Sequence, residues 1–70
     1  MPVGMEKYRT FLAAAGEQSF SAAAEKLFLT PSAVSKHIAA LEEELGVPLF
    51  IRTSAGVRLT EQGILCVPDR

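Results

Sequence analysis

The sequence predicts a mainly helical domain that carries one small β-hairpin. Two observations indicate the helices: apolar residues recur at three- and four-residue steps in successive stretches, and Ser19 and Thr30 stand where helix caps are expected. A third observation indicates the hairpin. The strand-like runs 49–52 and 57–59 flank residues 53–56, whose sequence Thr-Ser-Ala-Gly is typical of a turn.

Length and composition limit the chain to one small domain. It has 70 residues, of which 49% are hydrophobic, close to the lower limit for a self-sufficient core. No apolar run approaches the length of a bilayer span, so we expect no membrane segment. The single cysteine, Cys66, cannot form an internal disulfide, and the first residues lack a signal-peptide pattern. These features favour a reducing, cytoplasmic compartment.

The sequence lacks the residues that an enzyme active site requires. Cys66 and His37 have no third group at a plausible spacing for nucleophilic catalysis, and no glycine-rich phosphate loop is present. His37 also lacks a partner histidine or cysteine at metal-ligand spacing. We therefore expect no enzyme activity, no cofactor and no metal.

The first helix is expected over about residues 4–16. Its apolar residues follow helical spacing and are expected to pack in the core rather than bind a ligand: Met5, Tyr8, Phe11, Leu12 and Ala15. Gly16 is expected to end the helix or to lie close to its end, and residues 17–18 form a short connection.

The second helix is expected from the cap Ser19 to about Phe28. Its inward face carries Phe20, Ala23, Ala24 and Leu27, and the small alanines allow a neighbouring helix to approach closely. Leu29 then lies in a short connection to the next helix.

The third helix is expected over residues 31–45. Thr30 is its N-cap, Pro31 occupies the first helical position, and Gly46 ends it. The inward stripe consists of Val34, Ile38, Leu41 and Leu45. The outward face consists of Ser32, Lys36, Ala39, Ala40 and Glu43, with Ala33 and Ser35 on its flanks. Near its N-terminus this face has short side chains and one cation, as close approach to a DNA groove requires.

The hairpin and a further short helix follow. A two-stranded hairpin is marginal alone, so it is expected to lean on the helices through Leu49, Phe50, Val57 and Leu59. Thr60 is expected to cap a helix over residues 61–65, and Pro68 interrupts its continuation.

Two short helices joined by a tight connection, over about residues 20–39, form a helix-turn-helix, and the hairpin at about 49–59 forms a wing. A helical hairpin in an ordinary small bundle has the same periodicity. Periodicity alone therefore leaves DNA binding and a purely structural bundle equally open.

The motifs themselves resemble a known family. The segments Ser19-Phe-Ser-Ala-Ala-Ala-Glu-Lys-Leu27, Leu29-Thr-Pro-Ser-Ala-Val-Ser-Lys-His-Ile38, Leu41-Glu-Glu-Glu-Leu-Gly-Val-Pro-Leu-Phe50, Arg52-Thr53 and Gly56-Val-Arg-Leu-Thr-Glu-Gln-Gly63 are similar to the N-terminal DNA-binding domain of LysR-type transcriptional regulators. The resemblance covers nearly all of residues 5–63 without a gap. Several linked motifs at matching separations are more specific than any one of them.

The resemblance implies a winged helix-turn-helix in which helix 31–45 lies in the major groove of double-stranded DNA. The wing at 49–59 then touches the flanking backbone or minor groove. Thr30, Pro31, Ser32, Ser35 and Lys36 fall on positions that the family uses at the DNA surface, and Arg52 falls on its wing arginine.

This chain departs from the family pattern in two respects. The family commonly shows Ser-Gln-Pro-Ala where this chain has Thr30-Pro-Ser-Ala33, so the bidentate amide that reads adenine is absent. The family is often basic where this chain has Ala39 and Ala40, which removes cationic contacts to phosphates.

The residues expected to contact DNA are Thr30, Pro31, Ser32, Ala33, Ser35, Lys36, His37, Arg52, Thr53, Ser54 and Arg58. Each main candidate has a simpler alternative. Lys36 can be a solvated surface lysine, Ser35 can bond to a carbonyl of its own helix, and the wing arginines can form surface ion pairs. For His37, a peripheral phosphate contact and simple exposure are equally open. The run of Glu42, Glu43 and Glu44 is expected to be a solvated face turned away from phosphates.

The charge balance supports one alternative function. The formal net charge is −1 and the pI is about 5.7, which is unusual for a nucleic-acid binder. A winged-helix module that binds another protein, and not DNA, would suit this balance. The two functions differ in whether Lys36, Arg52 and Arg58 converge on one face.

The expected domain spans residues 1–63, and residues 64–70 are expected to be the truncated start of a linker helix or a frayed tail. LysR-type regulators continue into a long dimerising helix and an effector-binding domain, so the resemblance implies that effector sensing is absent from this chain. In the full-length regulator it implies a homodimer or homotetramer. A fragment is favoured over a short stand-alone protein.

Overall fold

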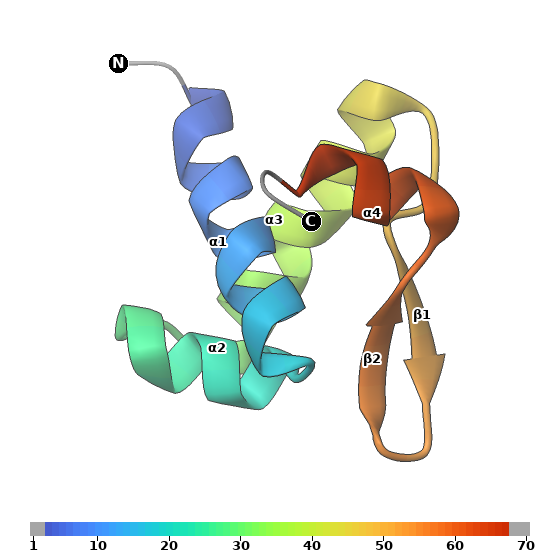
Figure 1. Ribbon diagram of the computed structural model, residues 1–70. Coiled ribbons are helices and arrows are strands. Elements are labelled where there is room, and N and C mark those ends of the chain that lie inside the picture. The colour runs from blue at the N-terminus through green and yellow to red at the C-terminus, as the bar shows by residue number, and fades with distance from the viewer. Residues whose placement is uncertain (1–2, 68–70) are drawn as a thin grey trace.

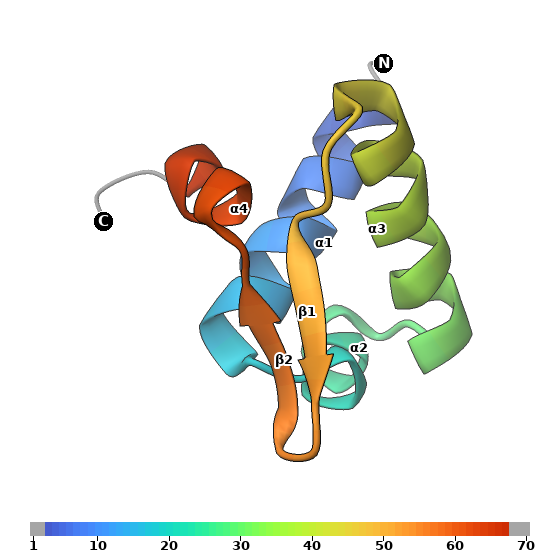
Figure 2. The ribbon, with the colours of Figure 1, turned by 90° about the vertical axis from the view of Figure 1, so that its right-hand side faces the viewer.

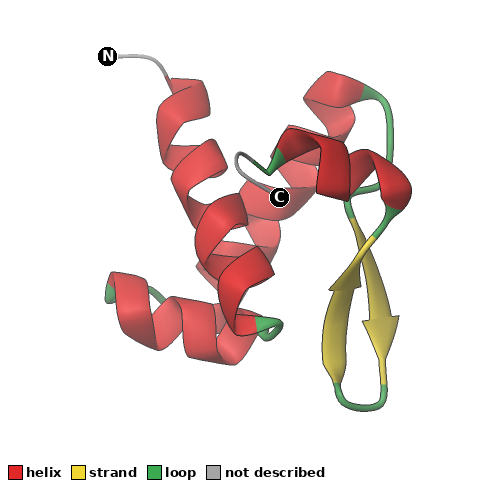
Figure 3. Ribbon diagram, in the orientation of Figure 1, coloured by secondary structure: helices red, strands yellow, loops and turns green. Residues whose placement is uncertain are grey.

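The computed structural model describes residues 3–67, with side chains from residue 6 onward. Helices α1 (Val3–Glu17), α2 (Phe20–Leu27) and α3 (Pro31–Leu45) precede strands β1 (Phe50–Thr53) and β2 (Gly56–Leu59) and a short helix α4 (Glu61–Cys66). Each of α1, α2 and α3 contacts the other two, and the hairpin stands beside this three-helix core (Figures 1 and 3). The predicted fold class, a winged helix-turn-helix, is confirmed.

The predicted helix caps are confirmed at three sites. The side-chain oxygen of Ser19 accepts a hydrogen bond from the backbone N of Ala22, at 3.1 Å. Thr30 caps α3 in the same way through Ala33, at 3.1 Å, and Thr60 caps α4 through Gly63, at 3.0 Å. Each cap satisfies an N–H group that the first helical turn leaves without a partner. These caps explain why the predicted start of α3 agrees with the structure.

The ends of the helices follow the sequence less closely. Gly46 ends α3 in the left-handed conformation, with φ of 73°, as predicted. The prediction that Gly16 lies at or close to the end of α1 is confirmed, since the helix ends at Glu17; the expected connection 17–18 is shorter by that residue, and Gln18 takes the left-handed conformation with φ of 57°. Phe28 ends α2 with φ of 60°. Neither Gln18 nor Phe28 is a residue type that signals such a turn.

The core lies where the three helices and the start of the hairpin meet. The buried hydrophobic side chains come from all of these elements: Phe11, Ala14, Ala23, Ala24, Val34, Ile38, Leu41, Leu49 and Val57. The prediction for Leu45 is wrong, since its side chain is 48% exposed. It stands in the last turn of α3, beyond the buried cluster. The Met5 side chain lies outside the described residues.

The hairpin is attached to the helices at both of its ends. β1 and β2 are antiparallel, with Phe50 opposite Leu59 and Thr53 opposite Gly56. The backbone N of Val57 donates to the carbonyl of Gln18, at 3.2 Å, which ties β2 to the end of α1. Figure 2 shows the hairpin extending beside α3. The prediction that the hairpin leans on the helices is confirmed by the burial of Leu49 and Val57.

Helix α4 packs closely over the base of the hairpin. It ends one residue beyond the predicted 61–65, and Pro68 lies outside the described residues. A Cβ atom at Gly63 would lie 2.4 Å from the carbonyl oxygen of Leu49, so only glycine permits this approach. The Tyr8 hydroxyl, on α1, donates to the carbonyl of Cys66, at 2.8 Å. None of the described helices is long and apolar enough to cross a membrane.

Candidate nucleic-acid interface

The outward face of α3 is open to solvent. The exposed residues of this face and of the preceding turn are Thr30, Pro31, Ser32, Lys36, Ala39 and Glu43, while Ala33, Ser35 and Ala40 are half-buried. Val34, Ile38 and Leu41 on the opposite side seat the helix on the core. The division between an inward apolar stripe and an outward polar face is therefore as predicted.

A groove separates α3 from β1, and functional candidates lie on both of its sides. It is lined by Phe20, Ser35, Ile38, Ala39, Glu42, Phe50 and Arg52. Ser35 comes from the N-terminal half of α3, and Arg52 comes from the first wing strand. The fold thus brings together two predicted DNA contacts that are separated in the sequence, because β1 runs alongside α3 (Figure 2).

The two wing arginines lie on opposite faces of the hairpin. Arg52 stands opposite Val57, and Arg58 stands opposite Ile51. Because neighbouring positions on a strand point to opposite faces, Arg52 shares the inward face with the buried Val57, and Arg58 shares the outward face with the exposed Ile51. The expectation that Arg52 and Arg58 converge on one face with Lys36 is therefore wrong for the two arginines, because the hairpin register separates them.

The tip of the wing carries the remaining two candidates. Thr53 and Ser54 are both exposed. The Thr53 hydroxyl accepts a hydrogen bond from the backbone N of Ala55, at 3.3 Å, which supports the tight turn. The turn between β1 and β2 lies at the end of the hairpin opposite α4 (Figure 1).

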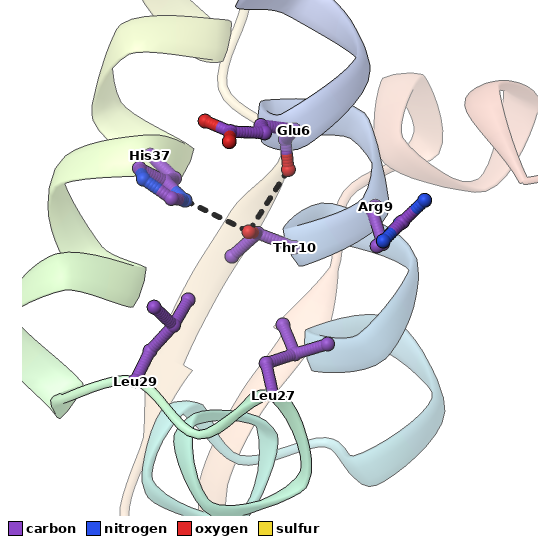
Figure 4. Close-up of a pocket in the computed structure, with 6 residues that line it drawn as sticks. All are labelled: Glu6, Arg9, Thr10, Leu27, Leu29 and His37. Atoms are coloured by element: carbon purple, nitrogen blue, oxygen red, sulfur yellow. Dashed lines mark hydrogen bonds between the residues drawn. The ribbon is translucent and has the colours of Figure 1, made fainter.

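His37, on α3, contacts α1. Its side chain is half-buried, so the alternative that His37 is simply exposed is wrong. The Thr10 hydroxyl, in a residue only 2% exposed, donates to the carbonyl of Glu6, at 3.0 Å. His37 Nδ1 lies 2.8 Å from the same Thr10 oxygen (Figure 4). The hydroxyl has one proton, so when it donates to Glu6 it accepts a hydrogen bond from the Nδ1–H tautomer of His37. No spacing in the sequence identified Thr10 as this partner.

The prediction that the acidic run is a solvated face is wrong only for Glu42, since Glu43 and Glu44 are both exposed. The Glu42 carboxylate accepts hydrogen bonds from the backbone N of Leu49, at 2.7 Å, and of Phe50, at 3.2 Å. Glu44 forms an ion pair with Lys7 of α1. Glu43 is exposed, as expected. The folded chain therefore uses two of these acids to hold the hairpin and α1 on α3.

In the described part of this acidic chain, the ion pairs do not involve the basic side chains of α3 and the wing. Within residues 3–67, the ion pairs join Lys7 to Glu44 and Lys26 to Glu17. Lys36, Arg52 and Arg58 take part in neither and are exposed. The net charge of −1 thus says little about the surface formed by α3 and the wing.

Similarity to known proteins agrees with this architecture. Residues 5–64 match the family described as bacterial regulatory helix-turn-helix protein, lysR family. The HTH-type transcriptional regulator DsdC of Escherichia coli is 54% identical over 59 residues, which are 84% of this chain and 19% of that protein. The uncharacterized regulator YxjO of Bacillus subtilis is 48% identical over 60 residues, 86% of this chain and 21% of that protein. The chain therefore spans about a fifth of these relatives.

Solved structures show the same fold in complexes with DNA. The CbnR DNA-binding domain, crystallised with DNA, superposes with a TM-score of 0.83 at 32% identity, covering 86% of this chain and 69% of that one. The BenM DNA-binding domain, crystallised with catB site 1 DNA, gives a TM-score of 0.84 at 40% identity, covering 89% and 69%. The chain thus belongs to the LysR family of bacterial regulatory helix-turn-helix proteins and is a DNA-binding domain of that family rather than an enzyme.

Proposed function

We propose that this domain recognises specific sequences in double-stranded DNA by placing α3 in the major groove and the wing against the flanking backbone or minor groove. The observation that carries the proposal is the placement of Ser35 and Arg52 on one groove, next to the exposed N-terminal half of α3. The CbnR and BenM domains, which have the same fold, were crystallised with DNA, and this supports the proposal.

The side chains at the proposed contact favour modest base discrimination. Ser32 and Ser35 are short, so α3 can approach the base edges closely, and each hydroxyl forms a single hydrogen bond. Lys36 supplies a cation to phosphate or guanine. Thr30 holds the first turn of α3 through Ala33, at 3.1 Å, and thereby fixes the orientation of these residues. Most affinity then comes from phosphate contacts, which depend on salt.

Selection of binding sequences from a random duplex pool tests the proposal most directly. A recovered consensus supports sequence-specific binding and gives the half-site. If the retained duplexes share no consensus, base-specific recognition is refuted.

Lys36→Ala tests the contact of α3. We expect weaker binding, with the slope of log affinity against log salt reduced by about one if the contact is with phosphate. Lys26→Ala is the matched control, because this exposed lysine lies on α2 next to Glu17. Equal affinities of the parent and Lys36→Ala at every salt concentration would remove Lys36 from the site.

The family match disfavours the alternative function, a winged helix that binds another protein and does not contact DNA. That alternative predicts no retention of the domain on heparin or on random duplex DNA at low salt. Lys36, Arg52 and Arg58 are exposed and take part in no ion pair within the described part of the chain, which favours retention on both.

We further propose that the whole regulator acts in the cytoplasm as a homodimer or homotetramer whose effector-binding domain lies outside these 70 residues. Two DNA-binding domains then engage two half-sites, separated by about one helical turn or a multiple of it. The isolated domain is expected to bind such a site more weakly than the full regulator. A tight dimer of the 70-residue chain at micromolar concentration, in analytical ultracentrifugation, would contradict this arrangement.

A further inference from the structure

The exposed side chain of Arg52 lies against an aromatic ring of α2. It lies on the hairpin face of Val57, whose side chain is 4% exposed. The guanidinium carbon of Arg52 lies 5.2 Å from the centroid of the Phe20 ring on α2, within the range of a cation–π contact. Within residues 3–67 Arg52 has no ion pair and no side-chain hydrogen bond. The aromatic ring is therefore the contact that orients the guanidinium.

The Phe20 ring is itself fixed by the core. It meets the Phe50 ring nearly at a right angle, with centroids 5.4 Å apart and an interplanar angle of 89°. The Phe50 centroid in turn lies 5.5 Å from that of the fully buried Phe11. A chain of three rings thus connects the position of Arg52 to the centre of the domain. An arginine restrained in this way loses less conformational freedom on binding an anion than an arginine free in solvent.

We propose that Phe20 is a positioning residue for Arg52: its ring holds the guanidinium beside α3, on the groove that Ser35 also lines, so that Arg52 meets the DNA backbone or minor groove in a preset orientation. The guanidinium carbon lies over the ring, and no hydrogen bond or ion pair within residues 3–67 engages its N–H groups, so these donors are available to phosphate oxygens. This inference rests on the proposed DNA contact of Arg52. It adds a residue of α2 that acts through Arg52 and is not among the predicted DNA contacts.

A double-mutant cycle tests the proposal, with affinity for a random-sequence duplex measured at low salt by fluorescence anisotropy. Phe20→Leu removes the ring and keeps an apolar side chain, whereas Phe20→Tyr keeps the ring. We expect Phe20→Leu to weaken binding about twofold to fivefold, as the loss of an exposed cation–π contact predicts. Phe20→Tyr should bind like the parent. In the Arg52→Ala background, Phe20→Leu should cause no further loss.

Two results of the cycle would overturn the inference. One is that Phe20→Leu lowers the affinity for DNA equally with and without Arg52, which would mean that Phe20 acts through the fold alone. The other is unchanged binding by Phe20→Leu when Arg52→Ala binds more weakly.

An NMR measurement on the free domain separates this inference from the proposed function. The ring current of Phe20 should move the chemical shifts of the Arg52 side-chain protons upfield, and Phe20→Leu should abolish this displacement of the chemical shifts. Absence of the displacement in the parent overturns the inference without any reference to DNA. If the displacement is present but Arg52→Ala binds DNA normally, the wing contact of the proposed function fails and the positioning role fails with it.

Discussion

Replacing Glu42 by alanine tests whether one carboxylate fastens the hairpin to α3. A single oxygen of Glu42 accepts hydrogen bonds from the backbone N of Leu49 and of Phe50, at 2.7 Å and 3.2 Å, in a partly buried setting. Glu42 also lies near the C-terminus of α3, where the helix dipole disfavours an acid, so these hydrogen bonds compensate for an unfavourable position.

The size of the effect follows from the two bonds. A hydrogen bond to a charged group contributes about 1.5–3 kcal/mol, and alanine leaves two donors without their acceptor. Because water reaches a partly buried site, we expect Glu42→Ala to lower the free energy of unfolding by about 2–4 kcal/mol. A 70-residue domain has about 4–10 kcal/mol in total, so the variant should be close to unfolding.

Urea denaturation followed by far-UV circular dichroism measures this change. Glu42→Gln should lose less, since its amide oxygen can still accept a hydrogen bond. Glu43→Gln is the matched control: Glu43 is exposed on the same helix and takes part in none of the ion pairs of the described chain, so its replacement should stay within about 0.5 kcal/mol of the parent. If Glu42→Ala is as stable as Glu43→Gln, the proposed attachment of the hairpin is refuted.

Three further substitutions have defined outcomes in the same assay. Gly63→Ala should destabilise the domain strongly, because its Cβ would lie 2.4 Å from a backbone oxygen. At Gly16 a Cβ would meet nothing within 4 Å, so Gly16→Ala should raise the free energy of unfolding by up to about 1 kcal/mol. Equal stabilities of the two variants would contradict this reasoning. Phe28→Gly should gain about 0.5–1 kcal/mol, since Phe28 has φ of 60° and is 95% exposed; a loss of stability would refute the assigned strain. Thr10→Val should lose about 0.5–1.5 kcal/mol by removing the hydroxyl that His37 contacts, and an unchanged midpoint would show that this hydrogen bond contributes nothing.

Local chemistry made much of the fold predictable. Thr30 and Gly46 determine where α3 starts and stops through short-range hydrogen bonding and left-handed geometry, so its bounds could be read from the sequence. The left-handed conformation of Gln18, just after α1, could not. It depends on Gln18 accepting the backbone N–H of Val57, a contact between residues far apart in the chain. Such a contact stabilises a positive φ at a non-glycine residue, and no local sequence pattern predicts it.

The candidate site was predictable to a similar extent. Helical periodicity separated the outward face of α3, with Ser32 and Lys36, from its buried side. The opposite directions of Arg52 and Arg58 follow from the hairpin register, which depends on a turn without the strong asparagine–glycine signal. The structural role of Glu42 was missed because it depends on how the chain returns after Gly46 to bring two amide groups to one carboxylate.

The close fit of Gly63 under the Leu49 carbonyl has a mechanical consequence. Helix α4 cannot slide or roll on the base of the hairpin without opening that contact, and the hairpin is anchored to α3 through Glu42. These contacts therefore resist a change in the angle between α4 and α3. In two copies joined through α4, such an attachment would favour one separation between the α3 helices.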